Sequence, residues 1–295
     1  MINIDIPNWS EYELLDSGNG RKLERFGKYI LNRIETQAMW RQSLDESAWH
    51  KADAIFRKTD DTNDRLRTGN RGVWDYRNNI PQSWTLSFEN LKLDLRLTPF
   101  GHVGIFPDQS NQWSWISEKI KNAGRPINVL SLFTYTGAST LAASDAGAQV
   151  VHIDASKQAI TWARDNQRLS GLADKPIRWI PEDALKFVKR EVRRVSRYDA
   201  IIMDPPKFGR GPQGEVWKFE ENSEELLDYC RQLLSDKPLF TLVTAYAVPI
   251  SSVTLGNLVS DSFRKHKGKV EFGELGLKQK NERILPTAIY ATWEA

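Results

Sequence analysis

The sequence has little cysteine, no long hydrophobic run and no large excess of charge of either sign. Its single cysteine, Cys230, excludes an intramolecular disulfide and a cysteine-rich zinc site, and we expect no metal. No apolar stretch approaches the roughly 18 residues of a membrane-spanning helix. The opening residues, MINIDIPNWSEYELL, lack the basic and then apolar layout of a signal peptide. We therefore expect a cytoplasmic protein with no membrane partner.

Charge is nearly balanced, with 41 Lys and Arg against 38 Asp and Glu, a net charge of +3. This balance permits a nucleic-acid substrate without indicating one, and it leaves the oligomeric state unknown.

Tryptophan is abundant, and its side chains either belong to the hydrophobic core or serve as base-stacking platforms. Seven of the 11 tryptophans precede residue 127: Trp9, Trp40, Trp49, Trp74, Trp84, Trp113 and Trp115.

From residue 127 onward, short apolar runs alternate with segments of helical periodicity. Such alternation predicts right-handed crossovers and a doubly wound, mostly parallel, Rossmann-like α/β sheet of seven strands. The last two strands are joined only by a loop, so we expect them to pair antiparallel. The expected strands are 127–133, 149–154, 177–180, 198–203, 238–244, 269–275 and 287–293.

The first 126 residues have a different pattern, in which short strands are separated by Gly and Asn turns. One helix is expected at 45–58, where Trp49 and Phe56 can share a face. Residues 59–72 are polar and contain glycine, which favours a mobile loop. We expect a β-rich substrate-recognition domain at 1–110 and a catalytic domain at 111–295. Strands are expected within 12–18, 21–34, 84–97 and 102–109.

The first crossover, SLFTYTGAST, contains one glycine, Gly137. A pyrophosphate cradle needs the pattern G-x-G-x-x-G, which is absent here. A single glycine still allows the backbone to approach an adenosine moiety, although TGA also fits a plain strand-to-helix turn.

Acidic residues follow the next strands. Asp154 comes 17 residues after Gly137 and can accept both ribose hydroxyls. Asp183 follows the third strand, where it can reach an adenine amino group or simply cap a helix. Asp204, followed by two prolines, ends the fourth strand. A glycine, two acids and D-P-P at four successive strand ends indicate a site for S-adenosylmethionine (SAM).

The segments NVLSLFTYTGASTLAASDAGAQVVHIDASKQAITWARDNQRLSGL and DPPKFGRG resemble the SAM-dependent methyltransferases related to the large-subunit ribosomal RNA methyltransferases (RlmI-like group). YELLDSGNGRKLERFG and GHVGIFPDQSNQWSW extend the resemblance over most of the chain. It implies that the segment from Phe106 to Gln109 covers the cofactor. The other implied cofactor contacts are Phe133, Thr134, Tyr135, Thr136, Gly137, Asp154, Ala155, Ser156, Asp183, Ala184 and Asp204.

Two acceptor chemistries are possible at such a site. Methylation of pyrimidine C5 requires a covalent thiolate nucleophile. In the C5-methylating branch, the resemblance places that cysteine just after the fifth strand, where this chain has Thr244, Ala245 and Tyr246. Cys230 lies instead in EELLDYCRQLL, which we expect to be a helix packed on the sheet. C5 chemistry is therefore disfavoured.

Methylation of an exocyclic amino nitrogen requires only correct placement of the acceptor. The Asp204 side chain and the Pro205 carbonyl can accept the two N–H groups, and Pro206 restricts the backbone. Phe208 can stack on the base. Lys207, which interrupts the usual order of such motifs, contacts a phosphate or substrate carbonyl, or pairs with a carboxylate.

A glycine-containing loop, 209–219, follows and is expected to order over the substrate, with Trp217 as an anchor or a base contact. The leading hypothesis is a SAM-dependent enzyme that methylates a base of ribosomal RNA directly. The alternatives are a SAM-dependent methyltransferase acting on a small molecule or protein, and a non-catalytic RNA-binding protein with a relic of the fold.

Overall fold

The computed structural model describes residues 3–59 and 71–295. The chain divides into two compact units: the first contains Met1–Asp5, Asn111–Leu275 and Thr287–Ala295, and the second contains Ile6–Ser110 and Gly276–Pro286. The expected mobile loop at 59–72 lies outside the described residues except at its ends. The division into a recognition domain and a catalytic domain stays a prediction.

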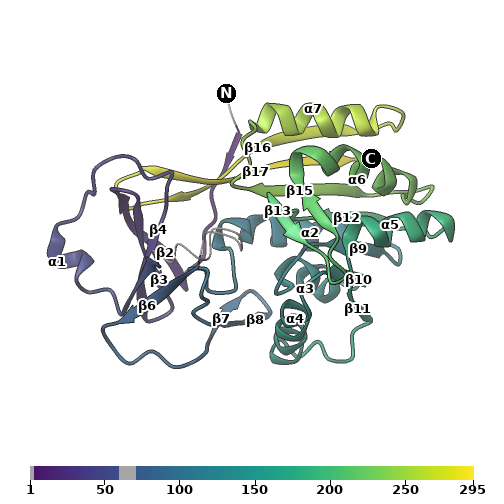
Figure 1. The fold of residues 1–295 in the computed structure, drawn as a ribbon. Coiled ribbons are helices and arrows are strands. Elements are labelled where there is room, and N and C mark those ends of the chain that lie inside the picture. The colour runs from purple at the N-terminus through teal and green to yellow at the C-terminus, as the bar shows by residue number, and fades with distance from the viewer. Residues whose placement is uncertain (1–2, 60–70) are drawn as a thin grey trace. The chain divides into compact units, whose positions relative to one another are not determined.

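The first unit is built on a mostly parallel sheet with the strand order β1-β16-β17-β15-β12-β9-β10-β11 (Figure 1). β17 is antiparallel to β15, and the pairs joining β15, β12, β9, β10 and β11 are parallel. The doubly wound α/β class is thus confirmed, and β1 adds a short edge strand parallel to β16. The strands are β1 (Asn3–Asp5), β9 (Asn128–Leu132), β10 (Gln149–Asp154), β11 (Ile177–Pro181), β12 (Ala200–Met203), β15 (Phe240–Tyr246), β16 (Lys269–Lys278) and β17 (Ile284–Glu294).

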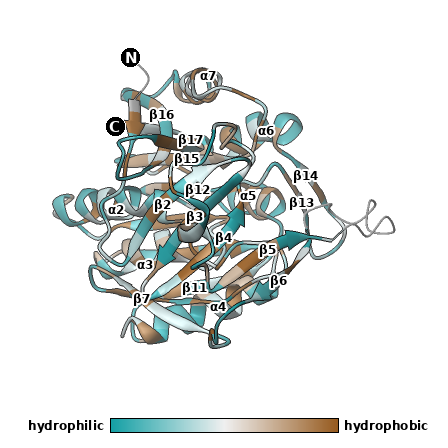
Figure 2. Ribbon diagram, turned by 90° about the vertical axis from the view of Figure 1, so that its left-hand side faces the viewer, coloured by the Kyte–Doolittle hydropathy of each residue, from teal (hydrophilic) through white to brown (hydrophobic). Residues whose placement is uncertain are grey.

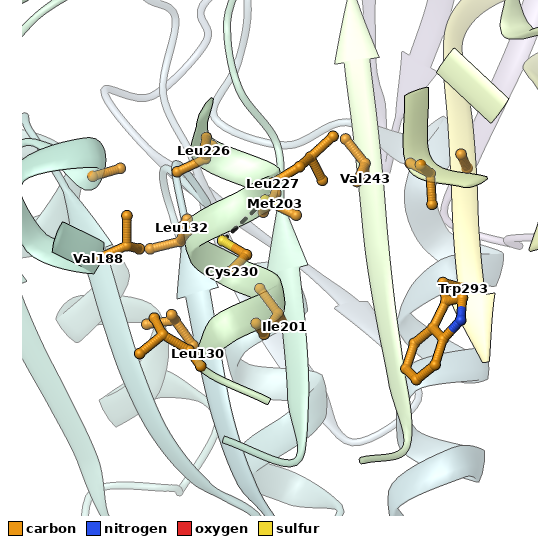
Figure 3. Close-up of a cluster of buried hydrophobic side chains, with 14 of the residues drawn as sticks. Leu130, Leu132, Val188, Ile201, Met203, Leu226, Leu227, Cys230, Val243 and Trp293 are labelled. Carbon is orange, nitrogen blue, oxygen red and sulfur yellow. Dashed lines mark hydrogen bonds between the residues drawn. The ribbon is translucent and has the colours of Figure 1, made fainter. Parts of the chain in front are cut away.

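Helices cover both faces of this sheet (Figure 1). Successive residues of a strand point to opposite faces. Leu130 and Leu132 therefore join the cluster that includes side chains of α5, α6 and α7 (Figure 3). Val129 joins the other cluster, with side chains of α2 and α3. Figure 2 shows hydrophobic and hydrophilic residues around the axis of α7, as expected of a helix that buries one face. The helices are α2 (Ser110–Asn122), α3 (Ala138–Asp145), α4 (Lys157–Leu169), α5 (Ala184–Arg193), α6 (Phe219–Gln232) and α7 (Ser252–Phe263).

The second unit is rich in strands, which confirms the expected β-rich N-terminal region. A five-stranded sheet follows the chain order from β2 to β6, and β7 pairs with β8. The turn between β2 and β3 has positive φ at Asn19 (53°) and Gly20 (73°), as tight hairpins require. These strands are β2 (Tyr12–Gly18), β3 (Arg21–Phe26), β4 (Tyr29–Ile34), β5 (Ala54–Lys58), β6 (Gly72–Tyr76), β7 (Trp84–Phe88) and β8 (Leu91–Leu95).

The helix expected at 45–58 is wrong in its second half. A short helix, α1 (Glu46–Trp49), begins at the N-cap Asp45, whose side chain accepts from the backbone N–H of Ala48. The following residues, Ala54–Lys58, form β5, which pairs with both β4 and β6. Ladder hydrogen bonds on two sides outweighed the helical spacing of the apolar residues.

The strand expected at 102–109 is also absent from the described residues. Pro107–Gln109 form a short 3₁₀ helix, η2, which leads into α2. Pro107 has no backbone N–H to contribute to a ladder and instead suits the first turn of a helix. Among residues 3–59 and 71–295, every helix is too short or too polar to reach across a bilayer.

Candidate active site

The parallel register brings the predicted site residues that follow the strands to one edge of the sheet. Leu132 of β9 pairs with Ile153 of β10 and with Met203 of β12. The chain then continues past each strand end, where the N–H of Asp204 donates to the Leu132 carbonyl at 3.1 Å. The loop after β9, Asp154, Asp183 and the D-P-P segment therefore follow neighbouring carboxyl ends, where open α/β sheets bind ligands.

The loop after β9, residues 133–137, is called the cofactor loop below. Phe133, Tyr135 and Gly137 have φ angles of 59°, 46° and 87°. Positive φ is unfavourable for the two aromatic residues and is found preferentially at functional sites. A Cβ at Gly137 would lie 3.1 Å from the Cβ of Ala163 in α4, so glycine suits this position for space as well as for φ.

A buried polar network holds the cofactor loop from beneath. The Thr134 hydroxyl lies 2.7 Å from that of Ser131 and 3.1 Å from Nδ1 of His152. Thr140 of α3 lies 2.8 Å from the same nitrogen. Burial lowers the pKa of His152 to about 3, so the ring is neutral. Ser131, Thr140 and His152 are not among the site residues expected from the sequence, although polar residues inside apolar strand runs are a usable signal.

Asp154 ends β10 with its carboxylate fixed by backbone groups. It accepts from the N–H of Tyr135 at 3.1 Å and of Ser156 at 2.8 Å. Burial raises the pKa of Asp154 to about 6, and no Lys or Arg of the described residues forms an ion pair with it. Four lone-pair sites with two occupied leave room for hydroxyl donors, which fits a ribose. Ala155 follows Asp154 in the chain. The hydroxyl of the next residue, Ser156, caps α4 by accepting from the N–H of Ala159.

Asp183 is the N-cap of α5. Its carboxylate accepts from the N–H of Lys186 at 2.8 Å, and the residue is buried together with Ala184. Asp183 therefore caps α5, at a buried position rather than a solvated one, while a contact with adenine stays a prediction.

The acceptor segment, defined as residues 204–208, is held through its backbone. The indole N–H of Trp217 donates to the Pro206 carbonyl at 2.6 Å. The N–H of Phe219 donates to the Lys207 carbonyl at 3.0 Å. Within the described part of the chain, no protein group donates to the Pro205 carbonyl.

The loop expected at 209–219 is largely an ordered hairpin of β13 (Phe208–Arg210) and β14 (Val216–Lys218). Trp217 lies on its buried face and contacts Phe133, with ring centroids 5.0 Å apart. Phe208 is 43% exposed, and the Arg210 guanidinium lies 5.8 Å from its ring centroid. The structure therefore assigns Trp217 as an anchor and leaves Phe208 accessible.

A family model of S-adenosylmethionine-dependent methyltransferases matches residues 35–228, more than half of the chain. The chain belongs to this family. The methyltransferase therefore uses SAM as its cofactor, and the enzyme class expected from the strand ends is confirmed.

Known relatives agree with this assignment. The crystal structure of the SAM-dependent methyltransferase from Agrobacterium tumefaciens is 41% identical, covers 99% of this chain and 93% of its own, and has a TM-score of 0.92. The crystal structure of SMU.776 complexed with SAH is 17% identical, with a TM-score of 0.72 over 96% of this chain and 75% of its own, and shows a shared fold.

The name of one relative states a substrate class. The ribosomal RNA large subunit methyltransferase K/L of Shewanella frigidimarina is 33% identical over 146 residues. The match covers 49% of this methyltransferase and 20% of that protein. About half of this chain thus corresponds to about a fifth of that relative.

Cys230 of the methyltransferase is buried in α6, among the side chains of Figure 3. Its thiol donates to the Met203 sulfur at 3.8 Å, and burial raises the pKa of the thiol far above its ordinary value. The predicted structural role of Cys230 is confirmed. Thr244 lies in β15, where its hydroxyl donates to Gln112 at 3.0 Å.

Phe106 and Gln109 belong to the second unit, so their contact with the cofactor stays a prediction. Across residues 3–59 and 71–295, no cluster of three His, Cys, Asp or Glu side chains is arranged to hold a metal ion.

Proposed function

We propose that this methyltransferase transfers the methyl group of SAM directly to an exocyclic amino nitrogen of a ribosomal RNA base. The observation that carries the proposal is the burial of Cys230, whose neutral thiol donates a hydrogen bond to the sulfur of Met203. C5 methylation requires a thiolate that can reach the base. Transfer to an amino nitrogen requires none.

The residues at the strand ends fit the cofactor. In the proposal, the Asp154 carboxylate accepts the ribose hydroxyls, and the cofactor loop approaches the adenosine through its backbone. Asp183 and Ala184 line the adenine side, and Ala155 and Ser156 flank the ribose. SAM supplies a methyl group activated by its sulfonium charge.

The acceptor segment orients the amino group. The Pro205 carbonyl and the Asp204 carboxylate accept its two N–H groups, so that the nitrogen lone pair points toward the methyl group. Such placement can supply a large part of the rate enhancement. Asp204 also receives the proton that the nitrogen loses after transfer.

Two exposed side chains support an RNA acceptor. Phe208 offers an accessible ring for stacking, worth about 1–3 kcal/mol per base. Lys207 is exposed beside it and can neutralise a phosphate. The name of the curated relative points to the same substrate class. The β-rich region within 1–110 is proposed to select the RNA.

The acceptor is tested with tritium-labelled SAM. Ribosomal RNA that lacks the methyl group added by this enzyme should accept label. Nucleoside mass spectrometry should then show a base methylated on its amino group. Label in a metabolite or protein fraction instead would refute the RNA acceptor. RNA binding without any transfer would support the non-catalytic alternative.

Removal of the cysteine tests the direct mechanism. Cys230→Ala should keep transfer within about twofold of wild type, because the thiol takes no part in the reaction. Loss of the buried sulfur should lower the free energy of unfolding by about 1 kcal/mol. A variant that folds but transfers no methyl group would contradict the proposal.

A further inference from the structure

We infer that Trp217 is a positioning residue of methyl transfer, because its indole fixes the acceptor segment so that the Pro205 carbonyl can receive the acceptor N–H. The inference rests on the function proposed above. Trp217 is only 3% exposed, so it acts through the backbone that it contacts.

Hydrogen bonds select one carbonyl of the acceptor segment. The indole N–H engages the Pro206 carbonyl at 2.6 Å, and the N–H of Phe219 engages the Lys207 carbonyl at 3.0 Å. The Pro205 carbonyl is left to accept from a ligand. Its direction is set by the anchored neighbour, because peptide planes are rigid and the ring of Pro206 fixes φ.

The same side chain contacts the cofactor loop. The Trp217 ring centroid lies 5.0 Å from that of Phe133, with the planes at 50°. Phe133 has positive φ and directly follows β9. One indole therefore packs on the start of the cofactor loop and bonds to the acceptor segment, so it sets the spacing between these two elements.

The hairpin fixes the indole in this place. Trp217 pairs with Gly209 on the inner face of the β13–β14 ladder, where a Cβ on Gly209 would lie 3.7 Å from the Cβ of Trp217. At the hairpin turn, Lys186 of α5 donates to Gln213 at 2.6 Å. The indole thus reaches Pro206 from an element that is itself tied to α5.

A purely structural role is the competing explanation, since Trp217 also belongs to the buried cluster that contains Leu130, Cys230 and Trp293. Trp293 provides a matched control. It belongs to the same cluster, is 1% exposed and stacks on Phe263 at 5.2 Å. Replacement of either tryptophan by phenylalanine keeps a ring and removes an indole N–H.

The experiment compares Trp217→Phe with Trp293→Phe in the full chain. Trp217→Phe should lower kcat of methyl transfer about 10- to 100-fold, because displacement of the acceptor by even 1 Å has effects of this size. The KM for RNA and the Kd for SAM should change less than about threefold, since only the reactive placement is lost. Trp293→Phe should keep kcat near wild type with a similar loss of stability, measured by urea unfolding.

Equal kcat values for the two variants would overturn the inference. The hydrogen bond is tested separately by exchange of the indole N–H in protein labelled with ¹⁵N-tryptophan. Slow exchange at Trp217 is expected, and exchange as fast as at an exposed indole would also overturn the inference.

If the wild-type enzyme labels a protein or metabolite fraction instead of RNA, the proposed acceptor is wrong. The kcat comparison on that fraction then decides the role of Trp217.

Discussion

The cofactor loop and the acceptor segment follow adjacent strands, β9 and β12, yet they are held by different means. Buried side chains support the cofactor loop, through the network of Ser131, Thr134, Thr140 and His152. Backbone carbonyls hold the acceptor segment, and the donors come from the β14 strand and the first residue of α6. Cofactor affinity and acceptor placement should therefore respond to different substitutions.

The largest effect is expected at Asp154. Asp154→Ala should raise the Kd for SAM by at least about 100-fold, because two hydrogen bonds to a charged group, each contributing about 1.5–3 kcal/mol, are lost. RNA binding in the absence of cofactor should be unchanged. Isothermal titration checks the affinity, and Asp174→Ala, at an exposed carboxylate of the same unit, is the control. Wild-type affinity in Asp154→Ala would remove Asp154 from the site.

The pH dependence of SAM binding tests the role of Asp154 in cofactor affinity separately from acceptor placement. Burial raises the pKa of Asp154 to about 6, so the folded protein favours the protonated form and ionisation lowers stability as pH rises from 4 to 6. The carboxylate is the form that accepts two hydroxyls. The Kd should therefore be constant above pH of about 7 and rise toward tenfold per unit below about 6. Asp154→Asn should bind weakly with a flat profile, and a flat wild-type profile would contradict this assignment.

A smaller effect is expected on the acceptor side. Phe208→Ala should raise the KM for RNA about tenfold, from the loss of about 1–3 kcal/mol of stacking, without changing the Kd for SAM. Val216→Ala, at an exposed residue of the same hairpin, should leave the KM near wild type. Equal KM values for the two variants would show that Phe208 does not stack on the substrate.

The smallest functional effect is expected in the network beneath the cofactor loop. Thr140→Val removes a hydroxyl that lies 2.8 Å from both Ser131 and His152. Urea unfolding should show a loss of about 1–3 kcal/mol, because buried polar partners are left unpaired. The SAM affinity should fall only a fewfold. Thr161→Val, at an exposed hydroxyl of α4, should change neither quantity, and an unaltered stability for Thr140→Val would show that the network is not structural.

Much of the first unit could be predicted, because its strands and helices have distinct hydrophobic periods. Parallel register then brings strand ends together, so Asp154, Asp183 and Asp204 were recognisable by position alone. The hairpin of β13 and β14 was missed because strands of three residues are too short to show alternation. Positive φ at Phe133 and Tyr135 could not be foreseen, since only the tertiary fold makes such strain tolerable.

The second unit was less predictable. The apolar residues at 54–58 have helical spacing, but their side chains also favour a strand. Pairing with β4 and β6 makes this segment a strand. The anchoring role of Trp217 was equally hidden, because its partner is a carbonyl rather than a recognisable side chain.

The strand order has a consequence for the folding of this protein during its synthesis. β17, the last strand of the chain, lies between β15 and β16, and β1 pairs with β16 across some 270 positions, with Asn3 opposite Gly273. Pairings between such distant segments slow folding. During synthesis, β15 emerges before β17, which covers its edge, and an uncovered edge invites association with other chains. Until β17 is made, the edge of β15 is open to hydrogen bonding with the strands of neighbouring chains.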